Sequence, residues 1–210
     1  MGPGGTKHPG PGADEQVANI IANSKMKHGV LMVLGPDDAG GLGRRLVEVC
    51  LLKGDFLLSS GRRSNYYFDK YLFETRPELL RDVTRELLSL VPEGTELLAG
   101  PELGAIPLVT GMGLQGDIPF LIVRKEPKEY GTARHFEGRI VPGQRVVLVE
   151  DVVTTGTQAL KAARLLQEFG VKLDVCLCVL DREEGGTESF AEIGLELQPL
   201  FTSSSLGLNR

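Results

Sequence analysis

The sequence contains no long apolar run, and this absence argues against a membrane protein. A transmembrane helix needs about 20 consecutive, mostly apolar residues, and no stretch of the 210 residues approaches that length. The N-terminus also lacks the apolar segment of a secretory signal peptide, because residues 1–12 read MGPGGTKHPGPG. We therefore expect a soluble, cytoplasmic protein that does not associate with a membrane.

Cysteine is scarce, and the three cysteines do not make a disulfide framework. Their number is odd, and Cys176 and Cys178 lie two residues apart in an apolar run. In a strand this spacing places both thiols on one face, which is a poor geometry for a disulfide, and two thiols are an incomplete zinc site. We expect Cys50, Cys176 and Cys178 to be buried and reduced.

An excess of basic residues is also missing. The net charge is −5 and the isoelectric point is near 5.3, whereas a general nucleic-acid binder needs a basic surface for phosphate contacts. We therefore expect no nucleic-acid partner. Positive charge is local, because Arg124–Arg139 carries five Lys and Arg residues and two glycines. A polar segment of this length inside a compact domain is either a functional loop or a solvated one.

The chain is long enough for one domain with a sizeable core, preceded by an extension. Residues 1–40 combine the flexible Gly/Pro-rich start with a predicted amphipathic helix over Ala13–His28. A Gly/Pro/Asp linker at 35–43 leads to a second helix predicted around Leu42–Leu52. We place the main domain at residues 41–210.

Downstream of residue 56, apolar segments of strand length alternate with amphipathic segments of helix length. Strands are predicted at 97–99, 120–123, 146–149 and 175–180, and helices at 77–90, 104–114 and 158–169. Phe56–Asp69 is predicted to form an N-terminal strand or hairpin with Ser60–Gly61 at its turn. Strands that alternate with helices imply an α/β fold, with a central parallel sheet flanked by helices.

The segment Val146–Thr157, VVLVEDVVTTGT, is the most informative part of the sequence. Its first four residues are typical of a strand buried on both faces, and Glu150 and Asp151 follow at the carboxyl end, where open α/β sheets bind ligands. Ionised side by side, these carboxylates only accept hydrogen bonds, so they suit a ribose diol or a hydrated cation.

The turn after the two acids suits a phosphate. Thr154–Thr157 offers three hydroxyls and backbone N–H groups at the start of a predicted helix, where the helix dipole favours an anion. The alternative is an ordinary strand-to-helix turn with a threonine N-cap and two solvated acids. Adjacent acids directly after a buried strand favour the first interpretation, which is a site for a phosphorylated sugar.

This motif resembles the phosphoribosyl pyrophosphate (PRPP) motif of type I phosphoribosyltransferases. Four further blocks agree with the resemblance in order: FLLSSGRRSNYYFD at 56–69, GPELGAIP at 100–107, RKEPKEYG at 124–131 and DREEGG at 181–186. Together the five blocks resemble the orotate-using members of the family over roughly residues 45–200. The resemblance implies a small hood on the α/β domain and transfer of a phosphoribosyl group from PRPP to orotate.

The resemblance also implies the residues that bind PRPP. They are Arg124, Lys125, Lys128, Tyr130, Glu150, Asp151, Val152, Val153, Thr154, Thr155, Gly156, Thr157 and Gln158. Of these, Lys125, Lys128 and Asp151 are the candidate catalytic residues, because cations stabilise the departing pyrophosphate and a carboxylate stabilises the cationic sugar. Mg²⁺ is expected as cofactor, held mainly through the diphosphate and water without a metal site on the protein.

In similar enzymes the 124–139 loop is a lid that acts in the neighbouring subunit's site, so the resemblance implies a homodimer. It further implies that Tyr67, Phe68, Thr154 and Arg182 bind orotate. A planar base needs flat apolar surfaces, and a guanidinium suits the base's carboxylate. The alternatives are core packing for the aromatic rings and a surface ion pair for the arginine.

Three residues depart from the family pattern. Many members carry Lys at the position of Ser59, and most carry His at the position of Tyr130, although His135 lies in the same loop. Glu102 places a carboxylate in the expected diphosphate turn. These departures leave two alternatives open: a type I phosphoribosyltransferase for another base, and a regulator that senses PRPP or nucleotides without catalysis.

Overall fold

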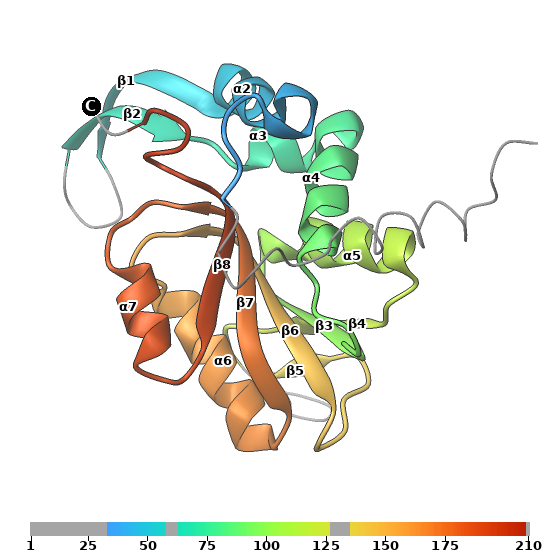
Figure 1. The fold of residues 1–210 in the computed structure, drawn as a ribbon. Helices are drawn as coiled ribbons and strands as arrows, with labels where there is room; N and C mark the ends of the chain where they lie inside the picture. Colours follow the sequence, from blue (N-terminus) through green and yellow to red (C-terminus); the bar gives the residue numbers. More distant parts are fainter. Residues whose placement is uncertain (1–32, 58–62, 127–134, 209–210) are drawn as a thin grey trace, which may run out of the picture. The chain divides into compact units, whose positions relative to one another are not determined.

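The structure is a computed structural model that describes residues 33–57, 63–126 and 135–208 (Figure 1). From Leu31 onward the chain forms one compact unit. The helix predicted over Ala13–His28 and the turn at Ser60–Gly61 lie outside the described residues. No helix in the described ranges is long and apolar enough to cross a membrane.

A six-stranded sheet forms the centre of the compact unit. Its strands are β3 (Leu97–Pro101), β4 (Phe120–Val123), β5 (Phe136–Glu137), β6 (Arg145–Val153), β7 (Lys172–Asp181) and β8 (Glu196–Thr202). Their order is β5-β4-β3-β6-β7-β8, and every neighbouring pair is parallel except β4 with β5. The predicted parallel sheet is confirmed, and four of its strands were predicted.

The two strands that were not predicted are both at the edges of this sheet. β5 has only two residues, too few for a periodic signal. β8 contains Pro199, which argues against a strand in a sequence but is tolerated at an edge, where the missing N–H is not needed.

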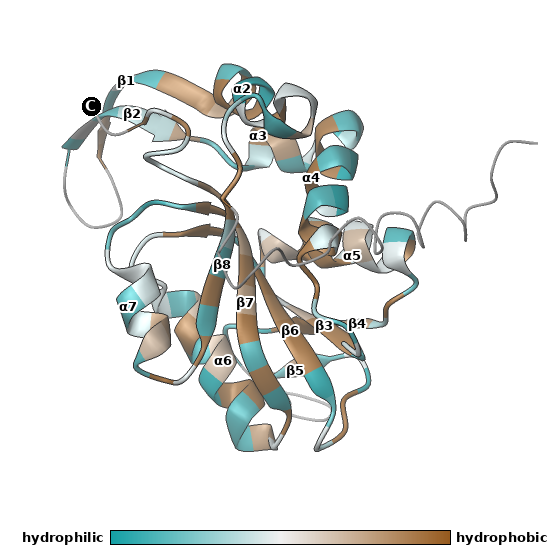
Figure 2. Ribbon diagram, viewed as in Figure 1, coloured by the Kyte–Doolittle hydropathy of each residue, from teal (hydrophilic) through white to brown (hydrophobic). Residues whose placement is uncertain are grey.

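Helices cover both faces of the sheet. One face packs against α2 (Asp38–Cys50), α4 (Pro77–Ser89) and α5 (Ala105–Gly116), and the other against α6 (Thr157–Phe169) and α7 (Gly186–Ala191). Alternation along β6 produces this division, because Val147 and Val149 belong to the first core and Val146 and Leu148 to the second. Figure 2 shows the resulting apolar centre in β6 and β7.

A hairpin and a short helix complete the fold at the N-terminal side of the compact unit. The strands β1 (Leu51–Leu57) and β2 (Arg63–Phe68) pair antiparallel, and α3 (Tyr71–Glu74) follows. A hairpin is therefore present, but its first strand begins at Leu51, before the predicted start at Phe56. The helix predicted around Leu42–Leu52 instead runs from Asp38 to Cys50, since Leu51 and Leu52 pair with Phe68 and Tyr67 in the hairpin.

The start of the compact unit lies before residue 41. The Leu34 N–H donates a hydrogen bond of 2.8 Å to the Leu200 carbonyl, and Leu34 and Ala39 pack against the core. Residues 34–40 are therefore attached to the sheet, and the domain boundary that we placed at residue 40 falls inside the compact unit.

The three cysteines are free and buried, as predicted. Burial raises the pKa of the Cys50 thiol to about 12 and raises the pKa values of Cys176 and Cys178 well above their ordinary range. Thiols react as thiolates, so these three side chains serve as small apolar core residues.

Candidate functional site

The strand order places the candidate site between β3 and β6. From β3 the chain continues to β4 on one side, and from β6 it continues to β7 on the other, so the order reverses between these two neighbours. In open α/β sheets the crevice at the carboxyl ends of such strands binds ligands. Glu102–Gly104 follows β3, and Thr154–Gly156 follows β6.

Three segments meet at the Asp151 carboxylate. Its Oδ2 lies 2.5 Å from the Nζ of Lys70, which directly precedes α3. A methyl group at Gly104 would overlap this carboxylate and would lie 2.9 Å from the Lys70 Nζ. The turn after β3, the end of β6 and the start of α3 are therefore in direct contact, and the glycine makes this close approach possible.

The expected pair of ionised acids is wrong in one respect. Successive residues of a strand point to opposite faces, so Asp151 faces Lys70 while Glu150 points toward the other core, beside Cys178 on β7. The Asp151 N–H donates a hydrogen bond of 3.0 Å to Glu150 Oε1. Burial, with the negative charge of Asp151 as a second cause, raises the pKa of Glu150 to about 8. Near neutral pH, the Glu150 carboxyl is therefore mostly protonated.

The threonine turn lies at the start of a helix, as predicted, and its binding of a phosphate stays a prediction. Gly156 has φ 77° and precedes α6, and a methyl group there would lie 2.7 Å from the Phe190 ring, so the position requires glycine. Thr155 Oγ1 lies 3.0 Å from Thr157 Oγ1, and both side chains are exposed. The first N–H groups of a helix have no intrahelical acceptor, so this turn can donate to an anion.

The remaining predicted residues of this motif surround the turn. Thr154 and Gln158 are exposed on either side of it, whereas Val153 is buried and Val152 is half-buried in the sheet. The two valines can therefore contribute mainly backbone groups to a ligand.

Glu102 has a structural partner that the sequence did not indicate. Its carboxylate accepts a hydrogen bond of 2.8 Å from the backbone N–H of Lys125, and its own N–H donates to the Val123 carbonyl. The carboxylate therefore ties the turn after β3 to the start of the 124–139 loop. This contact explains why an acid is tolerated in the expected diphosphate turn.

The base of the 124–139 loop is a short two-stranded ribbon. The Arg124 N–H donates a hydrogen bond of 2.8 Å to the His135 carbonyl, and the Arg124 guanidinium lies 3.8 Å from Glu137 on β5. The Lys125 side chain is exposed. Lys128 and Tyr130 lie outside the described residues, so their predicted contacts with PRPP stay predictions.

Arg182 stands at the carboxyl end of β7 and contacts the hairpin. Its Nη2 donates a hydrogen bond of 3.0 Å to the Tyr66 hydroxyl and lies 3.5 Å from Glu184, and the guanidinium stacks 5.1 Å from the centre of the Tyr66 ring. The buried Nε of Arg182 has no hydrogen-bond partner in the described part of the chain. Tyr66, which we did not predict, thus orients the arginine.

The two aromatic residues predicted to bind the base are placed differently. Phe68 is 5% exposed and belongs to the core, so the core-packing alternative applies to it. Tyr67 is 41% exposed, and its ring centre lies 5.7 Å from that of Phe56. Tyr67 therefore has the accessible ring surface that a planar base needs, and base binding by either residue stays a prediction.

Glu74 is a second buried carboxyl next to the site, and the sequence did not indicate it. Both of its carboxyl oxygens are buried without a hydrogen-bond partner among the described residues. Burial raises its pKa from the ordinary 4.5 to about 8, and the charge of Asp151 adds to this shift. The side chain is therefore mostly protonated near neutral pH.

This shift predicts a pH-dependent stability. The folded state holds the Glu74 proton more tightly than the unfolded chain, so the free energy of unfolding falls as pH rises from about 4.5 to about 8. Glu74→Gln has no carboxyl to ionise, so its free energy of unfolding should not fall in this way between about pH 4.5 and 8. At pH 8 the variant should be about 1–2 kcal/mol more stable than the wild type, and at pH 5 the difference should be much smaller. Urea unfolding at the two pH values measures it, with the exposed Glu78→Gln as control. An equal difference at both pH values would contradict the assignment.

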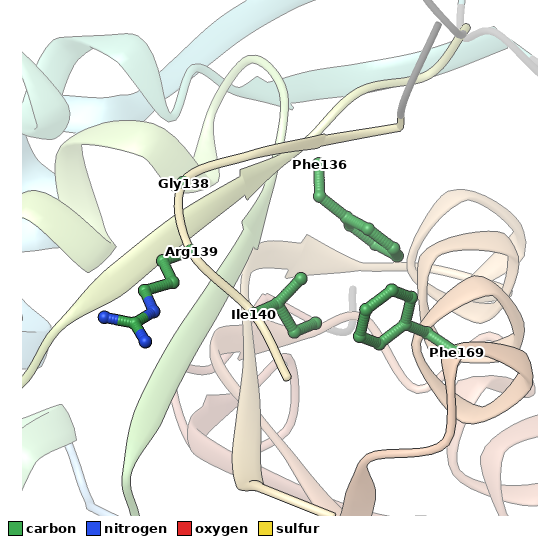
Figure 3. A pocket seen from close by; sticks show the side chains of 5 residues that line it. All are labelled: Phe136, Gly138, Arg139, Ile140 and Phe169. Carbon is green, nitrogen blue, oxygen red and sulfur yellow. The ribbon is translucent and has the colours of Figure 1, made fainter. Parts of the chain in front are cut away.

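A separate hollow lies away from these residues (Figure 3). It has a volume of about 250 Å³ and is lined by Phe136, Gly138, Arg139, Ile140 and Phe169. The three apolar side chains point toward one another and Arg139 points away from them. Phe169 ends α6 and the threonine turn begins it, so the hollow is at the opposite end of this helix and outside the candidate site.

The exposed threonine turn lies at the switch point of a parallel sheet. Residues 76–193 match the Phosphoribosyl transferase domain, so the chain is a member of the phosphoribosyltransferase class. The orotate phosphoribosyltransferase of Nocardioides sp. (strain ATCC BAA-499 / JS614) is 46% identical over 162 residues, which cover 77% of this chain and 90% of that protein. The chain belongs to the orotate phosphoribosyltransferase family, as the sequence blocks predicted.

Solved structures agree with this family. The Mycobacterium tuberculosis H37Rv orotate phosphoribosyltransferase in complex with Fe(III) dicitrate superimposes with a TM-score of 0.73 and 31% identity, covering 81% of this chain and 99% of that one. The same enzyme in complex with PRPP gives a TM-score of 0.69 and 28% identity, with the same coverage.

Proposed function

We propose that the protein transfers the phosphoribosyl group of PRPP to orotate, which yields orotidine 5′-monophosphate and pyrophosphate for pyrimidine biosynthesis. The observation that carries this proposal is the Asp151 carboxylate, which pairs with Lys70 against the turn after β3 and lies three residues before the exposed threonine turn. The family of the chain and the PRPP complex of the mycobacterial relative support PRPP as the donor.

In this proposal, different residues of the site would hold the different parts of PRPP. Thr154–Thr157 would hold the 5′-phosphate through hydroxyl and N–H donors. Asp151 would hold the ribose and stabilise the positive charge that develops at the anomeric carbon, so no protein nucleophile is needed. Lys125 and Lys128 would stabilise the departing pyrophosphate. Glu150, largely protonated near neutral pH, would bind the ribose hydroxyls as a neutral carboxyl.

We propose that Mg²⁺ arrives with the diphosphate of PRPP. Among the described residues no group of three or more His, Cys, Asp or Glu could hold a metal ion. Both Asp151 oxygens are engaged, one by Lys70 and one by the Val152 N–H. This donor set fits an ion bound mainly through phosphate oxygens and water, as is usual for Mg²⁺, and the ion would offset the diphosphate charge.

The test is the loss of orotate ultraviolet absorbance after addition of PRPP and magnesium. Loss that requires both PRPP and magnesium supports the proposal, and a reaction without PRPP does not. Adenine and uracil are tested in parallel, because turnover of another base would assign a different phosphoribosyltransferase. Calorimetric binding of PRPP without turnover of any base would assign a regulator.

Arg182 should decide the preference for orotate. Arg182→Met removes the guanidinium at the end of β7. This is expected to raise the KM for orotate about 30-fold, because the carboxylate of orotate loses a charged group that can donate two hydrogen bonds to it. The KM for PRPP should change less than about threefold. Tyr66→Phe, which removes only the hydroxyl that orients Arg182, should have a smaller effect in the same direction. Equal losses for both substrates would mean that Arg182 is only structural.

We further propose a homodimer in which the 124–139 loop acts in the neighbouring subunit's site. The loop leaves from the β4–β5 ribbon at one edge of the sheet, whereas Asp151 lies at its centre. Inactive Asp151→Asn and Lys128→Ala subunits, unfolded and refolded together, should regain up to about a quarter of the wild-type activity, since hybrid dimers contain one intact site. No recovery from a verified hybrid dimer would assign both residues to one subunit. The predicted cytoplasmic location stays a prediction.

A further inference from the structure

Lys70 contacts Asp151 at the centre of the site, but the proposed reaction gives the lysine no role. We propose that Lys70 binds the diphosphate of PRPP. Through its ion pair with Asp151, it also holds the carboxylate that would bind the ribose in place relative to the turn after β3. This inference rests on the proposed function, because it assigns a residue for the diphosphate of the same substrate. Three observations support it: the position of the ammonium group, its unused donors and the charge balance around it.

The position of Lys70 is set by the chain on both sides. The Asp69 N–H donates a hydrogen bond of 2.8 Å to the Cys50 carbonyl, and the Asp69 carboxylate accepts one of 3.1 Å from the Tyr71 N–H. The Lys70 ammonium also lies 5.5 Å from the centre of the Tyr71 ring. These contacts hold the backbone on which the lysine stands and direct its side chain toward Asp151.

The ammonium group retains the capacity to bind an anion. A lysine has three N–H donors, and in the described part of the chain its only hydrogen bond goes to Asp151 Oδ2. The side chain is 28% exposed whereas that of Asp151 is 2% exposed, so the lysine is on the solvent side of the pair. Its closeness to the methyl position of Gly104, 2.9 Å, places the remaining donors beside the turn after β3.

The charges around Lys70 suit an incoming diphosphate. The carboxyl groups that interact electrostatically with Lys70 are those of Asp151 and Glu150 from β6 and of Glu74 from α3. Burial raises the pKa values of Glu150 and Glu74 to about 8, so both are mostly neutral near pH 7. Neither carboxyl therefore adds a full negative charge near the lysine, so these two groups oppose an incoming diphosphate only weakly. The charge that accumulates on the leaving pyrophosphate would strengthen the contact in the transition state.

A purely structural role is the competing explanation, since a buried carboxylate needs a partner. Pyrophosphate alone, as a calorimetric titrant, separates the two. Lys70→Met should weaken pyrophosphate binding about 10-fold or more and lower kcat/KM for PRPP about 100-fold, with the KM for orotate within about threefold of wild type. Lys70→Arg should recover most of the pyrophosphate affinity. Lys161→Met, an exposed lysine on α6, is the matched control and should match wild type.

The outcomes are distinguishable. Unchanged pyrophosphate binding by folded Lys70→Met would overturn the inference, as would equal weakening of pyrophosphate, ribose 5-phosphate and orotate. If Lys70→Met does not fold, Lys70→Met combined with Asp151→Asn removes both charges, and pyrophosphate binding equal to that of Asp151→Asn alone would overturn it. If the wild type binds pyrophosphate but does not consume orotate, the proposed function fails while the pyrophosphate titrations still decide the role of Lys70.

Discussion

Asp151→Asn is expected to lower kcat/KM for PRPP by about 100-fold or more, because it removes the charged carboxylate that faces the developing positive charge of the sugar. The substitution keeps the shape of the side chain, and the asparagine oxygen can still accept from the Val152 N–H. The loss should appear mainly in kcat if the carboxylate acts in the transition state, and mainly in KM if it only binds ribose. Steady-state kinetics with varied PRPP measures both.

Loss of folding would not account for this result. The Lys70 side chain is partly exposed, so it can turn to water when its partner is neutralised, and we expect Asp151→Asn to cost at most about 3 kcal/mol. Circular dichroism and thermal unfolding check that the variant is folded. Asp174→Asn, the same change at an exposed position on β7, controls for the altered net charge. A folded Asp151→Asn protein with wild-type kinetics would remove Asp151 from the reaction.

Local sequence patterns predicted the parts of the site that depend on local structure. The apolar run Val146–Val149 fixes a buried strand, and the glycine and threonines after it fix a turn at a helix start. The structure has both, with Gly156 at φ 77° before α6. These features depend on the period of the side chains and on backbone sterics, which a single segment of sequence contains.

Contacts between distant segments could not be predicted in this way. Lys70 and Asp151 are 81 positions apart, and Tyr66 and Arg182 are 116 apart. Nothing in the sequence around Tyr66 and Lys70 indicates which strand end either side chain will reach. These pairs form only because the topology brings the carboxyl ends of β2, β3, β6 and β7 near one another.

Protonation states also required the structure. Adjacent acids at a strand end are ordinarily ionised, and the sequence supported that expectation for Glu150. Its burial on the α6 side of the sheet, beside the thiol-bearing strand β7, raises the pKa to about 8. Glu74 follows the same rule on the opposite face. Burial of this kind depends on which neighbours cover a side chain, and that information is not local.

Gly104→Ala should be nearly as damaging to activity as the loss of the carboxylate itself. Gly104 has φ −69° and ψ −29°, a conformation open to any residue, so backbone strain does not enter. The added methyl group would overlap the Asp151 carboxylate. Because the turn, the carboxylate and Lys70 cannot all keep their places, we expect kcat/KM for PRPP to fall about 100-fold and stability to fall by about 1–3 kcal/mol.

Gly35→Ala is the matched control, because Gly35 is outside the left-handed region and its methyl group would meet its nearest atom only at 3.3 Å. Wild-type kinetics in Gly104→Ala would show that the turn can move aside without consequence. The double variant with Asp151→Asn tests the cause. If both substitutions act by removing the same carboxylate from its place beside Lys70, the double variant should be about as active as Asp151→Asn alone, since losses at one shared group do not add. A multiplicative loss would instead mean that the glycine is required for a separate reason, such as the approach of the diphosphate to the backbone of the turn.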